Sequence, residues 1–233
     1  MNHTPQPPRM LHSLTTALLV FWLTSLWGFA QQPSCFAKNT SNVENTPASM
    51  PKKLTTQAIA TFAGGCFWCM QPPFDKTPGV ISTVVGYTGG PEKNPRYKQV
   101  AYGRTGHAEA IRVIYDPRKV SYTKLLQIFW RNIHPTQIRG QFADIGRQYR
   151  TAIFVHSPKQ RRQALASKKA LAKTGCFKKP IATQIQQAGP FYPAERYHQK
   201  YYKKNYAHYK RYRVGSGRAG YLQRKWTAQG CRK

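Results

Sequence analysis

The segment 58–74 constrains the fold of this chain more than any other. A short apolar run, AIATFA, ends at Gly64 and Gly65, and the residues CFWC follow directly. A short apolar run that ends at glycines predicts a buried strand. Because glycines permit an abrupt change of backbone direction, we expect a helix to begin at Cys66. The segment therefore predicts a sheet strand joined to a helix by a tight turn.

The rest of the chain continues this alternation. Runs rich in β-branched and apolar residues predict strands at 79–87, 107–115 and 149–155, and a weak strand at 181–185. Amphipathic spacing and capping residues predict helices at 121–133, 157–173 and 194–204. The intervening stretch 134–148 is a long polar loop, a kind of segment that is usually functional or mobile. We expect a single α/β domain with helices packed on a sheet.

Composition excludes some classes of protein. The chain has 14 Tyr, 11 Phe and 5 Trp, too many aromatic residues for a disordered basic protein. Five cysteines in 233 residues do not make a disulfide scaffold. The formal charge is +30, and cations alternate with tyrosines over 196–213, a pattern that can bind nucleic acid. No nucleic-acid motif is present, so we favour a solvated basic surface suited to anionic surroundings.

Residues 1–30 are predicted to be an export signal. Arg9 and His12 precede about fourteen mostly apolar residues, whereas a spanning helix needs roughly 20. Cleavage after Ala30 is the main expectation, and an uncleaved N-terminal anchor is the alternative. Both place the bulk of the chain outside the cytosol, in the periplasm or secreted. We expect a polar linker at 31–57, a folded domain at 58–228 and a short tail at 229–233.

The CxxC pair Cys66 and Cys69 is the strongest chemical signal. The N–H groups at a helix start favour a thiolate, so we expect a lowered pKa for Cys66. The spacing of the pair also allows a disulfide during turnover. A structural zinc site is disfavoured because no second CxxC or HxxxH appears. A buried structural pair and a thioredoxin-like disulfide exchanger remain alternatives.

Glu109 lies between alanines in a predicted strand. A half-buried carboxyl group there has a raised pKa and can donate a proton, although an outward-facing residue paired with an Arg is the alternative. Asp144, in the polar loop, suits either a turn or a ligand contact. Tyr87 and Tyr149 stand at strand ends and can point hydroxyl groups into a cleft, but such tyrosines more often pack.

Five ordered motifs, GGCFWC, GYTGG, TGHAEA, QFADIGRQYR and GPFYPAERYHQKYYKKN, closely resemble A-type methionine sulfoxide reductase (peptide-methionine (S)-S-oxide reductase). The resemblance covers residues 58–226. It implies an α/β (α+β) two-layer sandwich with a ferredoxin-like core, extended loops and a long C-terminal segment. It also implies reduction of methionine (S)-S-oxide, free or in proteins, in the repair of oxidised proteins. No metal or organic cofactor is implied.

The resemblance assigns roles to the reacting groups. Cys66 would attack the sulfoxide sulfur and retain a sulfenic acid. Glu109 would donate a proton to the sulfoxide oxygen, and Tyr87 and Tyr149 would bind that oxygen as an oxyanion site does. The substrate would be held by Phe67 and Trp68 at its methyl group and by Asp144 at its backbone.

The resemblance also implies how the sulfenic acid is removed. A second thiol condenses with it, and an external dithiol such as a thioredoxin-like protein reduces the resulting disulfide. Many members have Gly after GCFW and a resolving cysteine in a C-terminal tail, whereas this chain has Cys69 there. We therefore expect Cys69 to resolve, with Cys231 as second choice and Cys176 incidental. We expect a monomer; a CxxC thiol–disulfide oxidoreductase and a basic exported binding protein on a degenerate reductase fold are the alternatives.

Overall fold

The computed structural model describes residues 56–227 and residue 231. The predicted signal or anchor at 1–30 and nearly all of the linker at 31–57 lie outside the described residues, as does the predicted tail apart from Cys231. Within the described part of the chain, no helix has the length and apolar character that crossing a bilayer requires.

A six-stranded sheet forms the centre of the domain, with strand order β7-β6-β1-β3-β2-β8. The strands are β1 (Ala58–Gly64), β2 (Val80–Thr88), β3 (Ala108–Tyr115), β6 (Thr151–Val155), β7 (Gln184–Gln187) and β8 (Phe191–Pro193). Only β6 and β7 pair in parallel; the other neighbours are antiparallel. Phe62 of β1 lies opposite Ile111 of β3 and Ile153 of β6, so apolar side chains align across the middle of the sheet.

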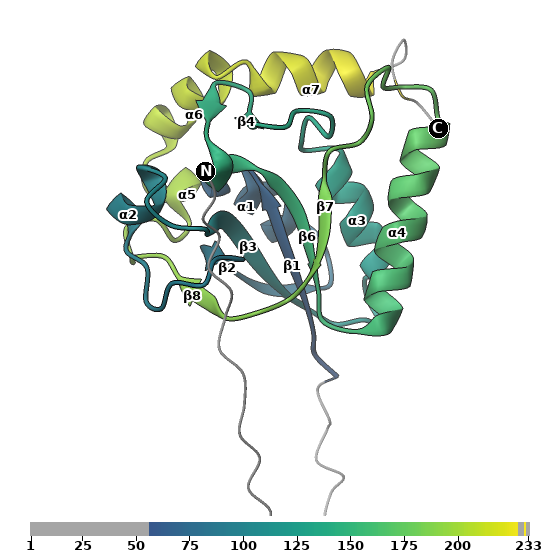
Figure 1. The fold of residues 1–233 in the computed structure, drawn as a ribbon, viewed down its shortest axis with the longest axis horizontal. Helices are drawn as coiled ribbons and strands as arrows, with labels where there is room; N and C mark the ends of the chain where they lie inside the picture. The colour runs from purple at the N-terminus through teal and green to yellow at the C-terminus, as the bar shows by residue number, and fades with distance from the viewer. Residues whose placement is uncertain (1–55, 228–230, 232–233) are drawn as a thin grey trace, which may run out of the picture. The chain divides into compact units, whose positions relative to one another are not determined.

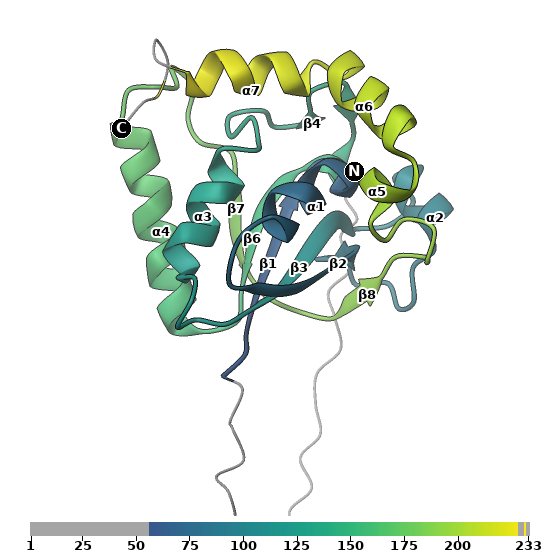
Figure 2. The ribbon, with the colours of Figure 1, turned by 180° about the vertical axis from the view of Figure 1, so that it is seen from behind.

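Helices cover one face of this sheet and bury the main core. They are α1 (Phe67–Asp75), α3 (Tyr122–Trp130) and α4 (Pro158–Lys173). Figure 2 shows α1 and α3 in front of the sheet and α4 at its edge. Phe62, Phe74 and Phe129 stack in this core, with ring centroids about 5 Å apart. The mixed α/β fold expected from the sequence is therefore confirmed, because the apolar stripes of these helices need the sheet to bury them.

The C-terminal segment adds a second group of helices. They are α5 (Tyr201–Lys204), α6 (Tyr206–Gly215) and α7 (Arg218–Trp226), and they run across the end of the sheet near the start of α1 (Figure 1). The short elements α2 (Tyr97–Ala101), β4 (Gly140–Gln141), β5 (Asp144–Ile145) and the 3-10 helix η1 (Arg147–Tyr149) lie in the loops. Segments distant in sequence thus meet at the point where β1 turns into α1.

Some predicted boundaries are wrong. The helix expected at 194–204 is helical only at Tyr201–Lys204, and the strand expected at 181–185 occupies Gln184–Gln187. Residues 191–193 form the edge strand β8, which pairs with β2 and was not predicted. These stretches are short and only partly buried, so their own residue pattern is weak and pairing with distant segments decides their conformation.

Candidate active site

The turn between β1 and α1 fixes the position of Cys66. Gly65 has a φ of +79°, and a Cβ atom there would lie 2.5 Å from Cβ of Gln141 and 2.7 Å from Nη2 of Arg218. Glycine is therefore required both by backbone conformation and by space. Cys66 caps the N-terminus of α1, and the backbone N–H of Cys69 donates to its carbonyl oxygen at 3.0 Å. Both thiols are free and buried.

Cys66 opens into a cavity of about 80 Å³. Its other walls come from α1, α2, β3, β5, η1 and α6, namely Phe67, Trp68, Tyr97, Glu109, Asp144, Tyr149 and Tyr212. Six residues singled out from the sequence thus meet around one space, although they come from four separate segments. The described residues contain no group of three His, Cys, Asp or Glu side chains suited to hold a metal ion.

Glu109 faces this cavity from β3 and is only 2% exposed. Its Oε2 accepts a hydrogen bond from the backbone N–H of Phe67 at 3.0 Å. Burial raises the pKa of Glu109 to about 8, with that hydrogen bond acting in the opposite direction. At neutral pH the carboxyl group is therefore mostly protonated, and it lies on the same side of the sheet as Cys66.

Tyr87 does not line the cavity, which corrects the prediction made for it. Its side chain is fully buried against Phe67, and its hydroxyl group donates to Oε2 of Glu195 at 2.8 Å. Tyr97 occupies the cavity wall instead. The same carboxylate, through Oε1, accepts the backbone N–H of Tyr97 at 2.9 Å. Glu195 therefore positions both tyrosines.

His198 and Tyr201 hold the indole of Trp68. The indole N–H donates to Nδ1 of His198 at 3.0 Å, and the indole ring stacks on Tyr201 with centroids 4.0 Å apart. Burial lowers the pKa of His198 to about 4, so the imidazole is neutral and can accept this bond. The C-terminal segment thus fixes an aromatic wall beside Cys66.

A second acidic group lies opposite Glu109. Asp144 is in β5, and the hydroxyl group of Tyr212 donates to its Oδ2. Burial raises the pKa of Asp144 above its usual value, and burial is also the main reason that the pKa of Tyr212 is raised. No local pattern marks Tyr212, because it is one of several tyrosines in a basic segment. Its role depends on α6 folding back onto α1.

The pKa expected for Cys66 is wrong in direction. Burial raises the pKa of Cys66 well above its ordinary value, and contacts with Cys69 add to this. The pKa of Cys69 is lowered to about 7, chiefly by a hydrogen bond with Cys66, and Arg218 and Arg213 also lower it. A helix N-terminus contributes about 1 kcal/mol, less than the cost of burying an anion beside Glu109. Of the two thiols, Cys69 is therefore the one that ionises more readily.

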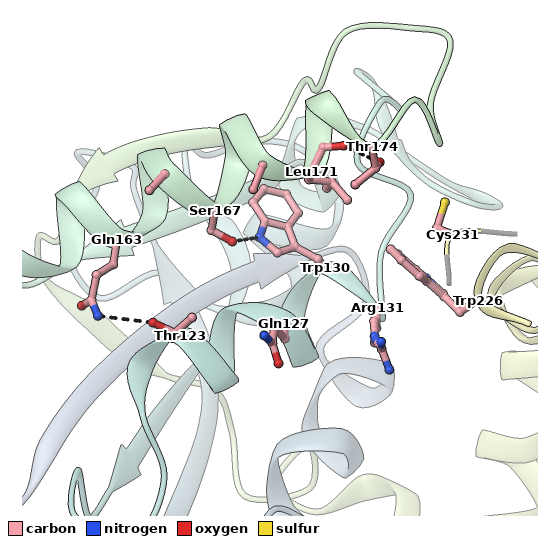
Figure 3. A pocket seen from close by; sticks show the side chains of 12 residues that line it. Thr123, Gln127, Trp130, Arg131, Gln163, Ser167, Leu171, Thr174, Trp226 and Cys231 are labelled. Carbon is pink, nitrogen blue, oxygen red and sulfur yellow. Dashed lines mark hydrogen bonds between the residues drawn. The ribbon is translucent and has the colours of Figure 1, made fainter. Parts of the chain in front are cut away.

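Cys176 and Cys231 are joined by a disulfide, so the expectation that Cys176 is incidental is wrong. Cys231 lies at a separate cavity of about 550 Å³ between α3, α4 and α7. Figure 3 shows it beside Trp226 and facing the end of α4 near Thr174. In this state Cys231 is neither free nor part of the cavity that contains Cys66.

Comparisons with known proteins agree on one family. The family model for peptide methionine sulfoxide reductase matches residues 58–230. The peptide methionine sulfoxide reductase MsrA of Bacillus pumilus is 55% identical over 171 residues, which cover 73% of this chain and 96% of that protein. Among solved structures, reduced Mxr1 from Saccharomyces cerevisiae matches with a TM-score of 0.60 and 33% identity, over 64% of this chain and 86% of that one.

A further solved structure extends the likeness. Methionine sulfoxide reductase A of Corynebacterium diphtheriae matches with a TM-score of 0.57 and 34% identity, covering 64% of this chain and 75% of its own. A family model that spans most of the described domain, together with relatives aligned over nearly their whole length, leaves one assignment. The chain belongs to the peptide methionine sulfoxide reductase family.

Proposed function

We propose that this methionine sulfoxide reductase acts on the S epimer of the sulfoxide, with Cys66 as nucleophile and Glu109 as acid. One observation supports these roles above all others: a thiol and a carboxyl group with a pKa near 8 line the same buried cavity. An unprotonated sulfoxide oxygen is a poor leaving group, so a carboxylic acid that remains protonated at neutral pH meets the main chemical requirement.

The first half of the reaction balances with these two groups. Glu109 protonates the sulfoxide oxygen, and the sulfur of Cys66 bonds to the sulfoxide sulfur. The S–O bond of the substrate breaks, and the oxygen, as a hydroxyl group, bonds to the sulfur of Cys66. The bond between the two sulfurs breaks, so methionine leaves and Cys66 keeps a sulfenic acid. The proton that the thiol loses restores Glu109. The raised pKa of Cys66 is compatible with this sequence, because a protonated sulfoxide carries positive charge and stabilises a thiolate beside it.

Side chains around the pair would orient the substrate. Tyr97 and Tyr149 are placed to hydrogen-bond the sulfoxide oxygen, and burial raises the pKa of both, so both keep their protons. Phe67 and Trp68 form the apolar wall for the methyl group. Asp144, held by the hydroxyl group of Tyr212, would accept hydrogen bonds from the substrate backbone.

Cys69 would complete the cycle. Its thiolate attacks the sulfenic acid of Cys66, an intramolecular disulfide forms, and water leaves after one proton is taken up. An external dithiol of the thioredoxin type then reduces the disulfide and becomes oxidised itself. The low pKa of Cys69 and its place one helical turn from Cys66 support this assignment, whereas Cys231 is bonded to Cys176.

We further propose that the protein works outside the cytosol, in the repair of exported proteins. The apolar run at 17–30 and the disulfide between Cys176 and Cys231 support an oxidising compartment. The excess of cations suits anionic surroundings.

Epimer selectivity tests the proposed activity. With dithiothreitol as reductant, the chain is expected to convert the S epimer of a methionine sulfoxide peptide to methionine and to leave the R epimer unchanged. Chromatographic separation of the products measures this. Reduction of insulin disulfides without any sulfoxide reduction would instead identify a thiol–disulfide exchanger, and salt-sensitive binding to anionic polymers as the only activity would identify a binding protein.

The two tyrosines offer a second test within the same cavity. Tyr97→Phe is expected to lower kcat/KM by about 10²-fold, because it removes a hydrogen-bond donor to the sulfoxide oxygen. Tyr87→Phe is expected to have a much smaller effect on kcat/KM but to lower the free energy of unfolding by roughly 1–3 kcal/mol, because a hydrogen bond to Glu195 is lost. Steady-state kinetics and denaturant unfolding measure the two effects, and the reverse pattern would return the oxygen-binding role to Tyr87.

A further inference from the structure

Arg218, at the first turn of α7, is the most deeply buried cation in the part of the chain that the structure describes. It is 1% exposed. Its Nη1 donates to the carbonyl oxygen of Asn132 at 2.7 Å, and its Nη2 donates to the carbonyl oxygen of Gly64 at 2.9 Å. The guanidinium plane lies over the ring of Phe142, with 4.5 Å between Cζ and the ring centroid. The group is thus fixed on several sides.

Among the residues that the structure describes, no carboxylate lies within ion-pair distance of this guanidinium. The described residues hold three ion pairs, formed by Glu92, Asp75 and Asp116, and Arg218 belongs to none of them. Burying a cation without a counter-charge costs free energy, so buried arginines are usually paired with carboxylates. Such a group is retained where its charge serves another group that carries negative charge.

The cysteine pair is placed to be that group. Arg218 bonds to Gly64, two residues before Cys66, and its Nη1 lies 3.8 Å from Sδ of Met70, the residue after Cys69. The guanidinium therefore contacts the chain on both sides of the pair, at the backbone of Gly64 and at the side chain of Met70. The cavity residues face the pair from the open end.

We propose that Arg218 is a positioning residue that stabilises the thiolate of Cys69 for its attack on the oxidised Cys66. This rests on the proposed function. In the step concerned, Cys69 thiolate forms the S–S bond, the S–O bond of the Cys66 sulfenic acid breaks, and the hydroxide released takes up one proton to leave as water. The guanidinium stabilises the thiolate of Cys69 before the attack and loses that role once the disulfide has formed.

Other groups around Cys69 also determine how readily its thiol ionises. Those that act on it or pack against it include Cys66, Glu109, Asp144, Tyr202, Tyr209, Arg213 and Arg218. The thiol of Cys66 stabilises the thiolate by a hydrogen bond, and Asp144 destabilises it. Arg213 is only half-buried and is therefore screened by solvent more than Arg218 is. The charge of Arg218 therefore acts on Cys69 with less solvent screening than the charge of Arg213.

The experiment measures thiolate formation directly. In the full chain carrying Cys35→Ser and Cys66→Ser, the remaining free thiol is Cys69, and its ultraviolet absorbance is followed against pH. Arg218→Gln keeps N–H donors for the two carbonyl groups but removes the charge. We expect it to raise the midpoint by about one pH unit, and Arg218→Lys to restore most of the original value. Arg112→Gln is the matched control, because Arg112 also lies over a phenylalanine ring but does not line the cavity that contains Cys66.

Rapid-mixing kinetics then test whether the shift in the Cys69 midpoint slows formation of the disulfide. With one equivalent of sulfoxide and Cys66 restored, Arg218→Gln is expected to form methionine at the normal rate and the disulfide roughly fivefold more slowly at pH 7, following the loss of thiolate. A midpoint in Arg218→Gln that equals the midpoint of the parent chain with Arg218 overturns the proposal. If the unmodified chain forms no methionine from the sulfoxide, the proposed function is rejected. The pH midpoint of Cys69 still tests the effect of Arg218 in that case.

Discussion

Cys66→Ser is expected to abolish sulfoxide reduction, whereas Cys69→Ser is expected to release one methionine per chain and then stop with a protein dithiol as reductant. Serine at position 66 cannot attack sulfur, because an alkoxide is not formed at neutral pH and oxygen is a poorer nucleophile toward sulfur. Serine at position 69 leaves the first step intact, since Cys66, Glu109 and the cavity walls are unchanged.

The two variants differ in the state of the enzyme after one equivalent of substrate. Cys69→Ser should carry a sulfenic acid on Cys66 that reacts with dimedone and is detected by mass spectrometry. The original chain should instead hold a disulfide between Cys66 and Cys69. Cys231→Ser is the matched control: it should form the disulfide between Cys66 and Cys69 as the original chain does, although it loses the stabilising bond to Cys176. If Cys231→Ser rather than Cys69→Ser halts the reaction after one turnover, the assignment of Cys69 is wrong.

Glu109→Gln is expected to lower the single-turnover rate at neutral pH by about 10²–10⁴-fold, because the amide keeps the shape of the side chain but cannot supply a proton. The raised pKa of Glu109 also predicts how the rate changes with pH. Burial raises the pKa of Glu109 from its ordinary value to about 8, so the acid is protonated below pH 8 and lost above it. The rate should therefore fall as the pH rises through 8.

Ionisation of Cys66 would give the opposite slope, a rate that rises with pH, so the two causes are separable. The fall above pH 8 should disappear in Glu109→Gln. Asp116→Asn makes the same chemical change at a carboxylate that pairs with Arg118 outside the cavity, and it should leave the profile unchanged. A rate that already falls above pH 5 would mean that Glu109 titrates as an ordinary carboxylic acid and is not the proton donor.

Local pattern was sufficient to single out Cys66 and Glu109, which line the same cavity in the structure. Cys66 follows a strand and two glycines, and Glu109 is an isolated acid in an apolar strand, so both stand out in a short stretch of sequence. Their meeting follows from the pairing of β1 with β3. The helices 121–133 and 157–173 were also predictable, because each has a serine cap whose side chain accepts a backbone N–H in the structure.

The surroundings of the site could not be predicted in the same way. Tyr97, His198, Tyr212 and Arg218 act through contacts with residues far away in the chain, and no periodicity marks them. The pKa of Cys66 was mispredicted because a helix terminus is visible in sequence, whereas the depth of burial is a property of the folded domain. The prediction that Tyr87 lines the cavity was wrong, because a position at the end of a strand does not determine which neighbour accepts a hydrogen bond from the hydroxyl group.

The disulfide between Cys176 and Cys231 has a consequence for the durability of the enzyme. It closes a loop with a sequence separation of 55, and that loop contains Glu195, His198, Tyr212 and Arg218. By the chain-entropy relation, a closure of this length is worth about 4 kcal/mol against unfolding. The segment that carries these residues is thus tethered at both ends by a bond that lies outside the cavity containing Cys66. A strong reductant would break this disulfide and loosen the segment, as well as reduce a disulfide between Cys66 and Cys69. The reducing power of a suitable electron donor therefore has an upper limit.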